Sequence, residues 1–338
     1  MVKSSHYKNI FRFSFFLALS FFLLYLVYKD QDWSDLWMML RKDVDYFWIF
    51  LAMFSGIFSH ASRARRWQLV TDSMGMPIRF VNSFMAVMIG YFANLAIPRI
   101  GEISRCGMIH KYEKAAFPKL IGTLIMERVV DMCILVVLTL TVVILQFGEI
   151  LYFFRMNREV GDNAVRMLTS FRFWILLGIF SVAFVFLLIF LRRNKYFSKV
   201  KNFMGELKEG IFSIFKLKHP WAFLFHSLII WLFYFFALYL CFQAFEFTKT
   251  LTPLMGLTIF VLGSYGMLAP VQGGVGAWHF MVISALVLYL PYVADIESIA
   301  KTFAFLSHGI MTLAYVVSGV ISLLLMPVYN ERLKKWKR

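Results

Sequence analysis

Long apolar runs separated by short polar stretches dominate the chain. A helix rises about 1.5 Å per residue and the hydrocarbon core of a bilayer is about 30 Å thick, so runs of roughly 17 to 25 residues are long enough to cross it. The pattern predicts about six spanning helices, near residues 11–28, 46–62, 119–147, 173–191, 221–245 and 301–328. Between the first two, Trp33, Trp37 and Met38 predict a short helix at the membrane interface. The chain is therefore predicted to be an all-α polytopic membrane protein.

Two further apolar stretches are interrupted near their middle. Residues 80–112 break at Pro98 and Gly101, and residues 251–290 break over the segment 270–276. Basic residues flank the first stretch on both sides. A full crossing would place one of these basic flanks outside, in conflict with the positive-inside rule. A re-entrant helical hairpin that returns to the cytoplasmic side removes this conflict. For the second stretch, a re-entrant hairpin and a pair of full crossings both remain open.

The two interruptions share a short motif. Residues 95–101 read LAIPRIG and residues 267–273 read MLAPVQG, so each places Pro-x-x-Gly after an apolar run. The order of the neighbouring spans is opposite in the two copies, which is typical of an inverted-topology repeat. We predict one integral membrane domain, residues 1–338, with one half at about 46–147 (re-entrant part 80–112) and the other at about 221–328 (re-entrant part 251–290). The broken helices of such repeats meet near the midplane and form the substrate site.

The composition agrees with this class. The 338 residues are 60% hydrophobic and only 16% charged, whereas a soluble domain carries about 25% charged residues. The net charge of +16 comes from Lys and Arg at the ends of apolar runs, which the positive-inside rule explains without a nucleic-acid partner. Both termini are then expected in the cytoplasm. Cys106, Cys133 and Cys241 lack metal-ligand spacing, and no cofactor motif is present, so neither a metal nor a cofactor is expected.

Charged residues in apolar surroundings are the main candidates for function, because charges in a bilayer are costly and usually serve a purpose. The candidates are Arg99, Glu102, Arg105, Glu127, Arg128 and Asp131. In one interpretation the arginines bind a phosphate and the carboxylates orient them, take an amino headgroup or take a proton. In the alternative interpretation the same residues form a structural ion pair. Unpaired N–H groups at the broken helix ends suit an anion, which adds Asn94, Gln272, Gly273 and Gly274 to the candidate substrate site.

Two smaller groups have competing interpretations. Arg63, Arg66 and Trp67 end an apolar run and favour a topology anchor at the cytoplasmic interface, with contact to a lipid headgroup as the sharper alternative. His279 and His308 lie in or beside apolar segments. A proton relay is one hypothesis for them, and an interhelical hydrogen bond is the favoured one.

Together the motifs resemble the flippase-like membrane domain of lysylphosphatidylglycerol synthases, over nearly the whole chain. The resemblance is carried by the Arg63–Trp67 region, Asn94-x-x-x-Pro98-x-x-Gly101-Glu102-x-x-Arg105, Glu127-Arg128-x-x-Asp131 and Pro270-x-x-Gly273-Gly274-x-Gly276. It implies a bacterial or archaeal cytoplasmic-membrane protein with two re-entrant elements. This chain has His279 and Ser307-His308 where family members often have Glu and Arg, which argues against specificity for a lysine-bearing lipid.

The predicted function is that of a lipid translocase, flippase-like, which moves a phospholipid or a lipid-linked headgroup between the leaflets of the bacterial cytoplasmic (inner) membrane. Membrane lipids are the expected partners, and a homodimer is compatible with the pattern. The aminoacyl-transfer domain is not among these residues, so synthase activity is not expected. Two alternatives are a membrane-embedded headgroup-transferring enzyme and an accessory scaffold for a lipid-modifying enzyme.

Overall fold

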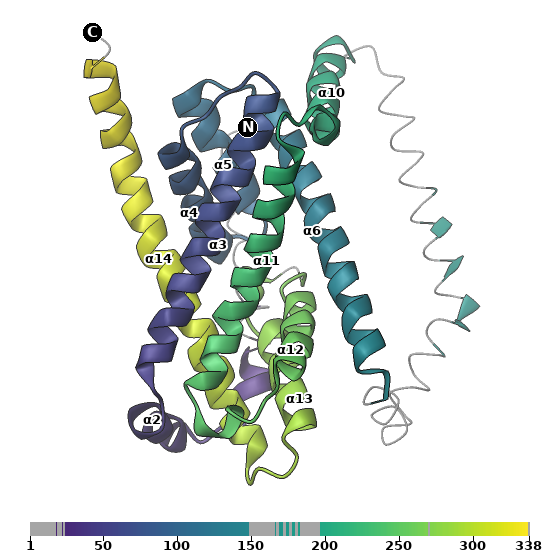
Figure 1. Ribbon diagram of the computed structural model, residues 1–338, viewed down its shortest axis with the longest axis vertical. Coiled ribbons are helices and arrows are strands. Elements are labelled where there is room, and N and C mark those ends of the chain that lie inside the picture. The colour runs from purple at the N-terminus through teal and green to yellow at the C-terminus, as the bar shows by residue number, and fades with distance from the viewer. Residues whose placement is uncertain are drawn as a thin grey trace.

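The computed structural model describes residues 24–148, 197–269 and 271–336, with a few isolated residues outside these ranges. Within these ranges the regular structure is helical, apart from one isolated bridge between Val44 and Phe245, so the predicted all-α membrane fold is confirmed. The long helix α14 runs along the bundle, with α10 at one end and α2 at the other (Figure 1). Most of the spans predicted at 11–28 and 173–191 falls outside the described residues.

The described helices follow the predicted segments closely. They are α2 (Trp33–Lys42), α3 (Tyr46–Ser73), α4 (Phe80–Ala96), α5 (Ile100–Glu113), α6 (Phe117–Leu145), α10 (Phe197–Ile211), α11 (Pro220–Gln243), α12 (Pro253–Gly266), α13 (Ala277–Tyr289) and α14 (Ile296–Trp336), with short 3₁₀ turns at Phe212–Lys216, Glu246–Thr248 and Gln272–Gly274 (η3). Among the described segments, four are long and apolar enough to span a membrane: Phe117–Leu145, Pro220–Gln243, Gln272–Tyr289 and Ile296–Leu333.

Local sequence explains where several helices begin. Asp32 accepts a hydrogen bond from the backbone N of Ser34 at 2.7 Å and caps α2, which is the helix predicted at the interface. Asp45 caps α3 in the same way, through the backbone N of Phe47 at 3.0 Å. These carboxylates satisfy donors that the first turn leaves free. The chain therefore makes a sharp turn from α2 into α3.

Several boundaries differ from the prediction, and two of the differences concern α3 and α10. The span expected to end near residue 62 continues as α3 to Ser73, because the arginines after residue 62 are good helix formers and find acidic partners inside the bundle. The polar stretch 192–220, which lies between two predicted spans and was assigned no helix, contains α10. This helix crosses α6 where Gly122 meets Gly210, and Lys119 forms a 2.8 Å ion pair with Glu209. The Lys119 ammonium lowers the pKa of the Glu209 carboxyl below its usual value.

The two interrupted stretches each form a helical hairpin. Helices α4 and α5 pack against each other in the upper part of the bundle, and α12 packs against α13 in the lower part (Figure 1). The first hairpin turns at Arg99, which has a left-handed φ of 61°, and the second turns through Gly273 and Gly276, with φ of 58° and 83°. In the first turn the side-chain oxygen of Asn94 accepts from the backbone N of Gly101 at 2.7 Å, which satisfies a free donor of α5.

The tips of the two hairpins meet. A guanidinium nitrogen of Arg99 donates to the carbonyl of Leu268 at 3.1 Å, and the amide of Gln272 donates to the carbonyl of Ala96 at 2.7 Å. Helix α12 is about 20 Å long at about 1.5 Å per residue, which is less than the bilayer core, and α13 reaches spanning length only together with the turn η3. Two tips that reach each other from opposite ends favour the re-entrant alternative for residues 251–290.

Cysteine labelling tests how deep the second hairpin reaches. In a protein whose Cys106, Cys133 and Cys241 are replaced by alanine, Thr250→Cys at the base of the hairpin should react with an impermeant maleimide from the outside. Ala269→Cys at the tip should react from neither side, because the tip of a re-entrant hairpin that meets the first hairpin lies away from both membrane faces. Labelling of Ala269→Cys from the cytoplasmic side would show instead that the segment crosses the membrane twice.

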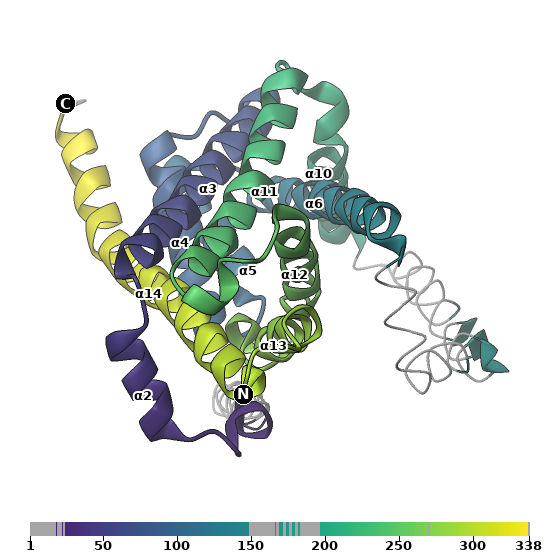
Figure 2. The ribbon, with the colours of Figure 1, turned by 60° about the horizontal axis from the view of Figure 1, so that its bottom comes forward.

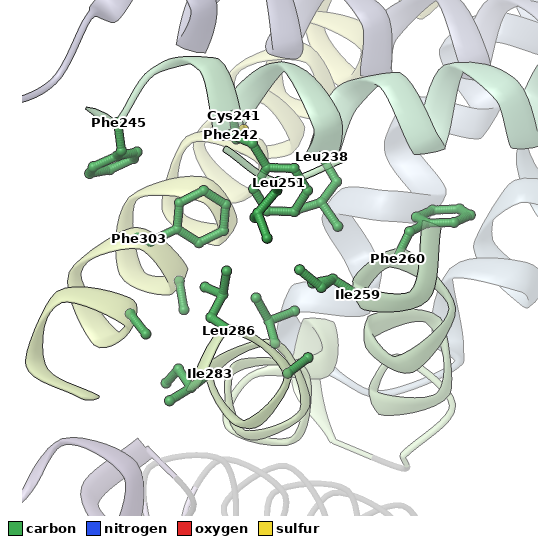
Figure 3. Packing of buried hydrophobic residues seen from close by; sticks show 14 of the residues in the cluster. Leu238, Cys241, Phe242, Phe245, Leu251, Ile259, Phe260, Ile283, Leu286 and Phe303 are labelled. Atoms are coloured by element: carbon green, nitrogen blue, oxygen red, sulfur yellow. The ribbon is translucent and has the colours of Figure 1, made fainter. Parts of the chain in front are cut away.

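The largest apolar cluster holds the lower half together. The ring of Phe303 in α14 stacks on that of Phe242 in α11 with the centroids 5.2 Å apart. The ring of Phe245 lies against that of Phe303, with the centroids 5.3 Å apart. Leu286 and Ile259 bring α13 and α12 into this cluster (Figure 3). The second hairpin is thus packed on α11 and α14, which holds its tip under the first hairpin.

Candidate functional site

A buried network of charges joins α3 to α6. Arg63 and Arg66 lie one turn apart on α3, and both donate to the Asp131 carboxylate of α6, at 3.0 and 2.7 Å. The second guanidinium also donates to the hydroxyl of Ser227 on α11 at 3.2 Å. The side chain of Arg66 is fully buried and that of Asp131 is 10% exposed. Charges this deep in a helix bundle need partners of opposite sign, and α3 and α6 supply them.

A second carboxylate extends the network to α5. Glu127, 1% exposed, lies 3.4 Å from Arg66 Nε and accepts from Arg105 Nη1 at 3.1 Å. The Arg105 guanidinium also lies 3.8 Å from the ring centroid of Trp67, a cation–π contact. Trp67 is fixed in turn, because its indole N–H donates to the hydroxyl of Thr123 at 2.9 Å. The network therefore ties the first hairpin to the two helices beside it.

The network carries more positive charge than negative. Three buried arginines face two buried carboxylates, which leaves an excess of one positive charge. Several guanidinium nitrogens have no hydrogen-bond partner among the described residues: Arg63 Nε, Arg66 Nε and Nη2, and Arg105 Nε and Nη2. Of these, Arg66 Nε faces Glu127 Oε1 at 3.4 Å, an oxygen that accepts no hydrogen bond either. A buried donor without a partner costs about 1–3 kcal/mol. The arrangement has the charge and the free donors to receive an anion such as a phosphate, which arginine binds through two parallel bonds.

A separate ion pair lies at the edge of this network. Arg128 donates to the Glu102 carboxylate at 2.6 Å, and the two side chains are 55% and 27% exposed. This pair links α5 to α6 on the side of the helices that remains accessible. Because an exposed pair separates easily, a charged group approaching from that side has a cation within reach.

The remaining predicted substrate residues lie at the hairpin tips. Arg99 is exposed and bonds to Leu268, so it belongs to the tip contact and not to the buried network. Asn94 accepts a hydrogen bond within the first turn, and Gln272 donates from the second turn to the first. Gly273 and Gly274 take left-handed conformations in the second turn. The predicted set is therefore divided among the buried network, the accessible Arg128–Glu102 pair and the contact between the two hairpin tips.

The structure places Arg63, Arg66 and Trp67 inside the bundle. They are 4%, 0% and 0% exposed, so their side chains are enclosed by protein, and the anchor and headgroup-contact interpretations stay predictions. The physical reason is pairing, since two of them meet Asp131 and the third supports Arg105. Arg65 is the exposed arginine of this motif and bonds to Gln68 at 3.0 Å.

Four aromatic residues next to Arg63 were not identified in the sequence. The hydroxyls of Tyr91 and Tyr234 are 2.8 Å apart, and Tyr234 lies 3.4 Å from Nδ1 of His60. The ring of Tyr315 stacks on that of Tyr91 at 5.0 Å. One signal was available, because His60 precedes Arg63 by three residues and so shares its helix face. The tyrosines come from α4, α11 and α14, and no local pattern joins them.

The two histidines of the second half lie side by side at the glycine-rich turn. Their ring centroids are 4.7 Å apart. Nδ1 of His279 accepts from the backbone N of Gly276 at 3.2 Å, and Nε2 of His308 lies 2.9 Å from the carbonyl of Gly273. The contact of His308 joins α14 to the turn, whereas the contact of His279 lies at the start of its own helix α13 and is not the interhelical bond that was expected. The proton relay stays a prediction.

Comparison with known proteins gives one match. A family model described as the lysylphosphatidylglycerol synthase TM region matches residues 13–319. No curated protein and no solved structure matches the chain. No cluster of metal-ligating side chains occurs in the described part of the chain.

Proposed function

The chain belongs to the family of lysylphosphatidylglycerol synthase TM regions, and on that premise we propose that it is a translocase for a lipid with an anionic headgroup. Membership makes it a membrane protein of a family concerned with lipids. The proposal adds the process, which is movement of the headgroup across the bilayer with no covalent bond made or broken. It also places the protein in the bacterial cytoplasmic membrane with both termini inside.

The observation that carries the proposal is the excess positive charge of the buried network. Arg63, Arg66 and Arg105 each carry a buried N–H group that has no hydrogen-bond partner, and two carboxylates neutralise only two of the three charges. A purely structural network gains stability from balanced charge and satisfied donors. A lipid phosphate supplies the missing negative charge and accepts the free N–H groups.

The rest of the architecture supports a path for the headgroup. The Arg128–Glu102 pair is accessible at the edge of α5 and α6, so it meets a phosphate before the buried arginines do. Paired broken helices whose tips meet inside the bundle are the usual setting for a substrate site in transporters built as inverted repeats. The lipid's acyl chains stay in the bilayer while its headgroup passes along the polar side chains.

Transport of fluorescent phospholipids in liposomes tests the proposal. Protein with wild-type sequence should move labelled phosphatidylglycerol between leaflets, as judged by accessibility of the label to dithionite. Arg128→Ala should slow this movement about tenfold, since it removes one charge-assisted contact worth about 1.5 kcal/mol. Arg65→Ala removes another exposed arginine that lies outside the network and should transport like the wild type.

Two results would count against a translocase. One is the absence of movement for anionic and zwitterionic phospholipids alike, with protein that is folded and correctly inserted. The other is a chemical change in the labelled lipid, detected by chromatography of the extracted vesicles, which would favour the headgroup-transferring enzyme.

A further inference from the structure

A groove lies between α2 and α14, away from the charged network. Its volume is about 340 Å³, which falls in the range of about 300–1,000 Å³ typical of ligand pockets. Helix α2 contributes Trp37, Leu40 and Arg41, and α14 contributes Phe305, Gly309 and Leu313. Figure 2 shows α2 at the edge of the bundle beside α14, so the groove opens toward the outside of the protein. It shares no residue with the network, and the inference does not rest on the proposed function.

The walls of the groove are almost entirely apolar. The hydroxyl of Tyr46, which also lines it, already donates to the carbonyl of Leu40 at 2.7 Å. Besides the indole N–H of Trp37, the polar side chain that lines the groove is that of Arg41, which is exposed and has no acidic partner within 4 Å among the described residues. An apolar groove with one free cation at its side matches a molecule with an apolar chain and an anionic head.

Gly309 opens the floor of the groove. A β-carbon added at this glycine would have no heavy atom within 4 Å, so open space lies directly over the backbone of α14. The position is therefore able to hold part of a bound chain. It also offers a variant that fills the groove without disturbing the packing of the bundle.

Helix α2 carries residues that are typical of a membrane interface. Trp33 and Trp37 of α2 are exposed, and tryptophan prefers the headgroup region of a bilayer. Arg41 stands in the last turn of the same helix, four residues after Trp37 and on the same face, and an arginine beside tryptophans of this kind suits a lipid phosphate. We propose that the groove binds one acyl chain of a membrane phospholipid, with the phosphate of that lipid on Arg41.

Native mass spectrometry of the detergent-solubilised full chain tests this site. The protein is titrated with phosphatidylglycerol, or with diacylglycerol carrying the same chains, and the retained lipid is counted. Gly309→Leu should bind both lipids about tenfold more weakly, because its side chain takes the place of buried methylene groups. Gly205→Leu, the same change at a glycine of α10 with open space around it, should bind like the wild type. Arg41→Gln should weaken phosphatidylglycerol about tenfold and leave diacylglycerol unchanged.

Each alternative has its own result. Wild-type affinity in Gly309→Leu would overturn the groove as the lipid site, and equal binding of phosphatidylglycerol by wild type and Arg41→Gln would overturn the phosphate contact. A dimer that Gly309→Leu dissociates would show that a second copy of the chain fills the groove instead. If Gly309→Leu does not fold, Gly309→Ala, which adds one methyl group into open space, should give a smaller loss in the same direction.

Discussion

Replacing Arg105 by glutamine should slow translocation of phosphatidylglycerol about 100-fold while the protein keeps its fold. The guanidinium has two nitrogens without partners, and two charge-assisted hydrogen bonds to a phosphate are worth about 3 kcal/mol together. The fold should survive because the variant leaves two arginines facing two carboxylates in the network, so the buried charge becomes balanced. The dithionite assay in liposomes measures the rate, and thermal unfolding in detergent measures the stability.

Arg65→Gln is the matched control for this change. Arg65 lies on α3 between the two network arginines but is exposed and bonds to Gln68, so the same substitution should leave transport unchanged. Arg105→Lys separates charge from geometry, since it keeps the cation and loses the fork that grips a phosphate. Wild-type transport by Arg105→Gln, in protein with an unchanged melting temperature, would rule out the network as the anion site.

Glu127→Gln should lower the free energy of unfolding by about 3–5 kcal/mol. This carboxylate is 1% exposed and lies between Arg66 and Arg105. Without its charge, the three buried arginines of the network face a single carboxylate, that of Asp131. Breaking a buried ion pair from one side costs this much because the remaining charge is uncompensated. Thermal unfolding in detergent, followed by circular dichroism, measures the loss as a lower melting temperature.

Two comparisons make this result specific. Glu209→Gln removes an exposed carboxylate paired with Lys119, and no change in melting temperature is expected, because solvent screens such pairs. The double variant Glu127→Gln/Arg105→Gln removes one charge of each sign and should recover much of the lost stability. If the single variant melts like the wild type, the arginines are balanced by other means and the description of the network is wrong.

Sequence reasoning placed most of the helices because their signals are local. Apolar runs predicted α6, α11 and α14 within a few residues at most boundaries, except that α14 extends well beyond the predicted span at its C-terminal end. The interruption near Pro98 was also local, because proline removes a backbone donor and the residue before it avoids the helical conformation. The candidate charges Glu127 and Asp131 followed from their position in an apolar run.

The partners of those charges were decided by the tertiary structure. Arg63 meets Asp131 across 68 residues, and no pattern along the chain shows which of several arginines a buried carboxylate will reach. The same holds for the meeting of Arg99 with Leu268 at the hairpin tips. Sequence alone established an all-α membrane protein with interrupted helices and intramembrane charges, because hydrophobicity and backbone breaks act over a few residues. Which charges pair, and which remain free for an anion, depends on packing among α3, α5 and α6, because Coulombic and hydrogen-bonding interactions require groups to lie within a few ångströms.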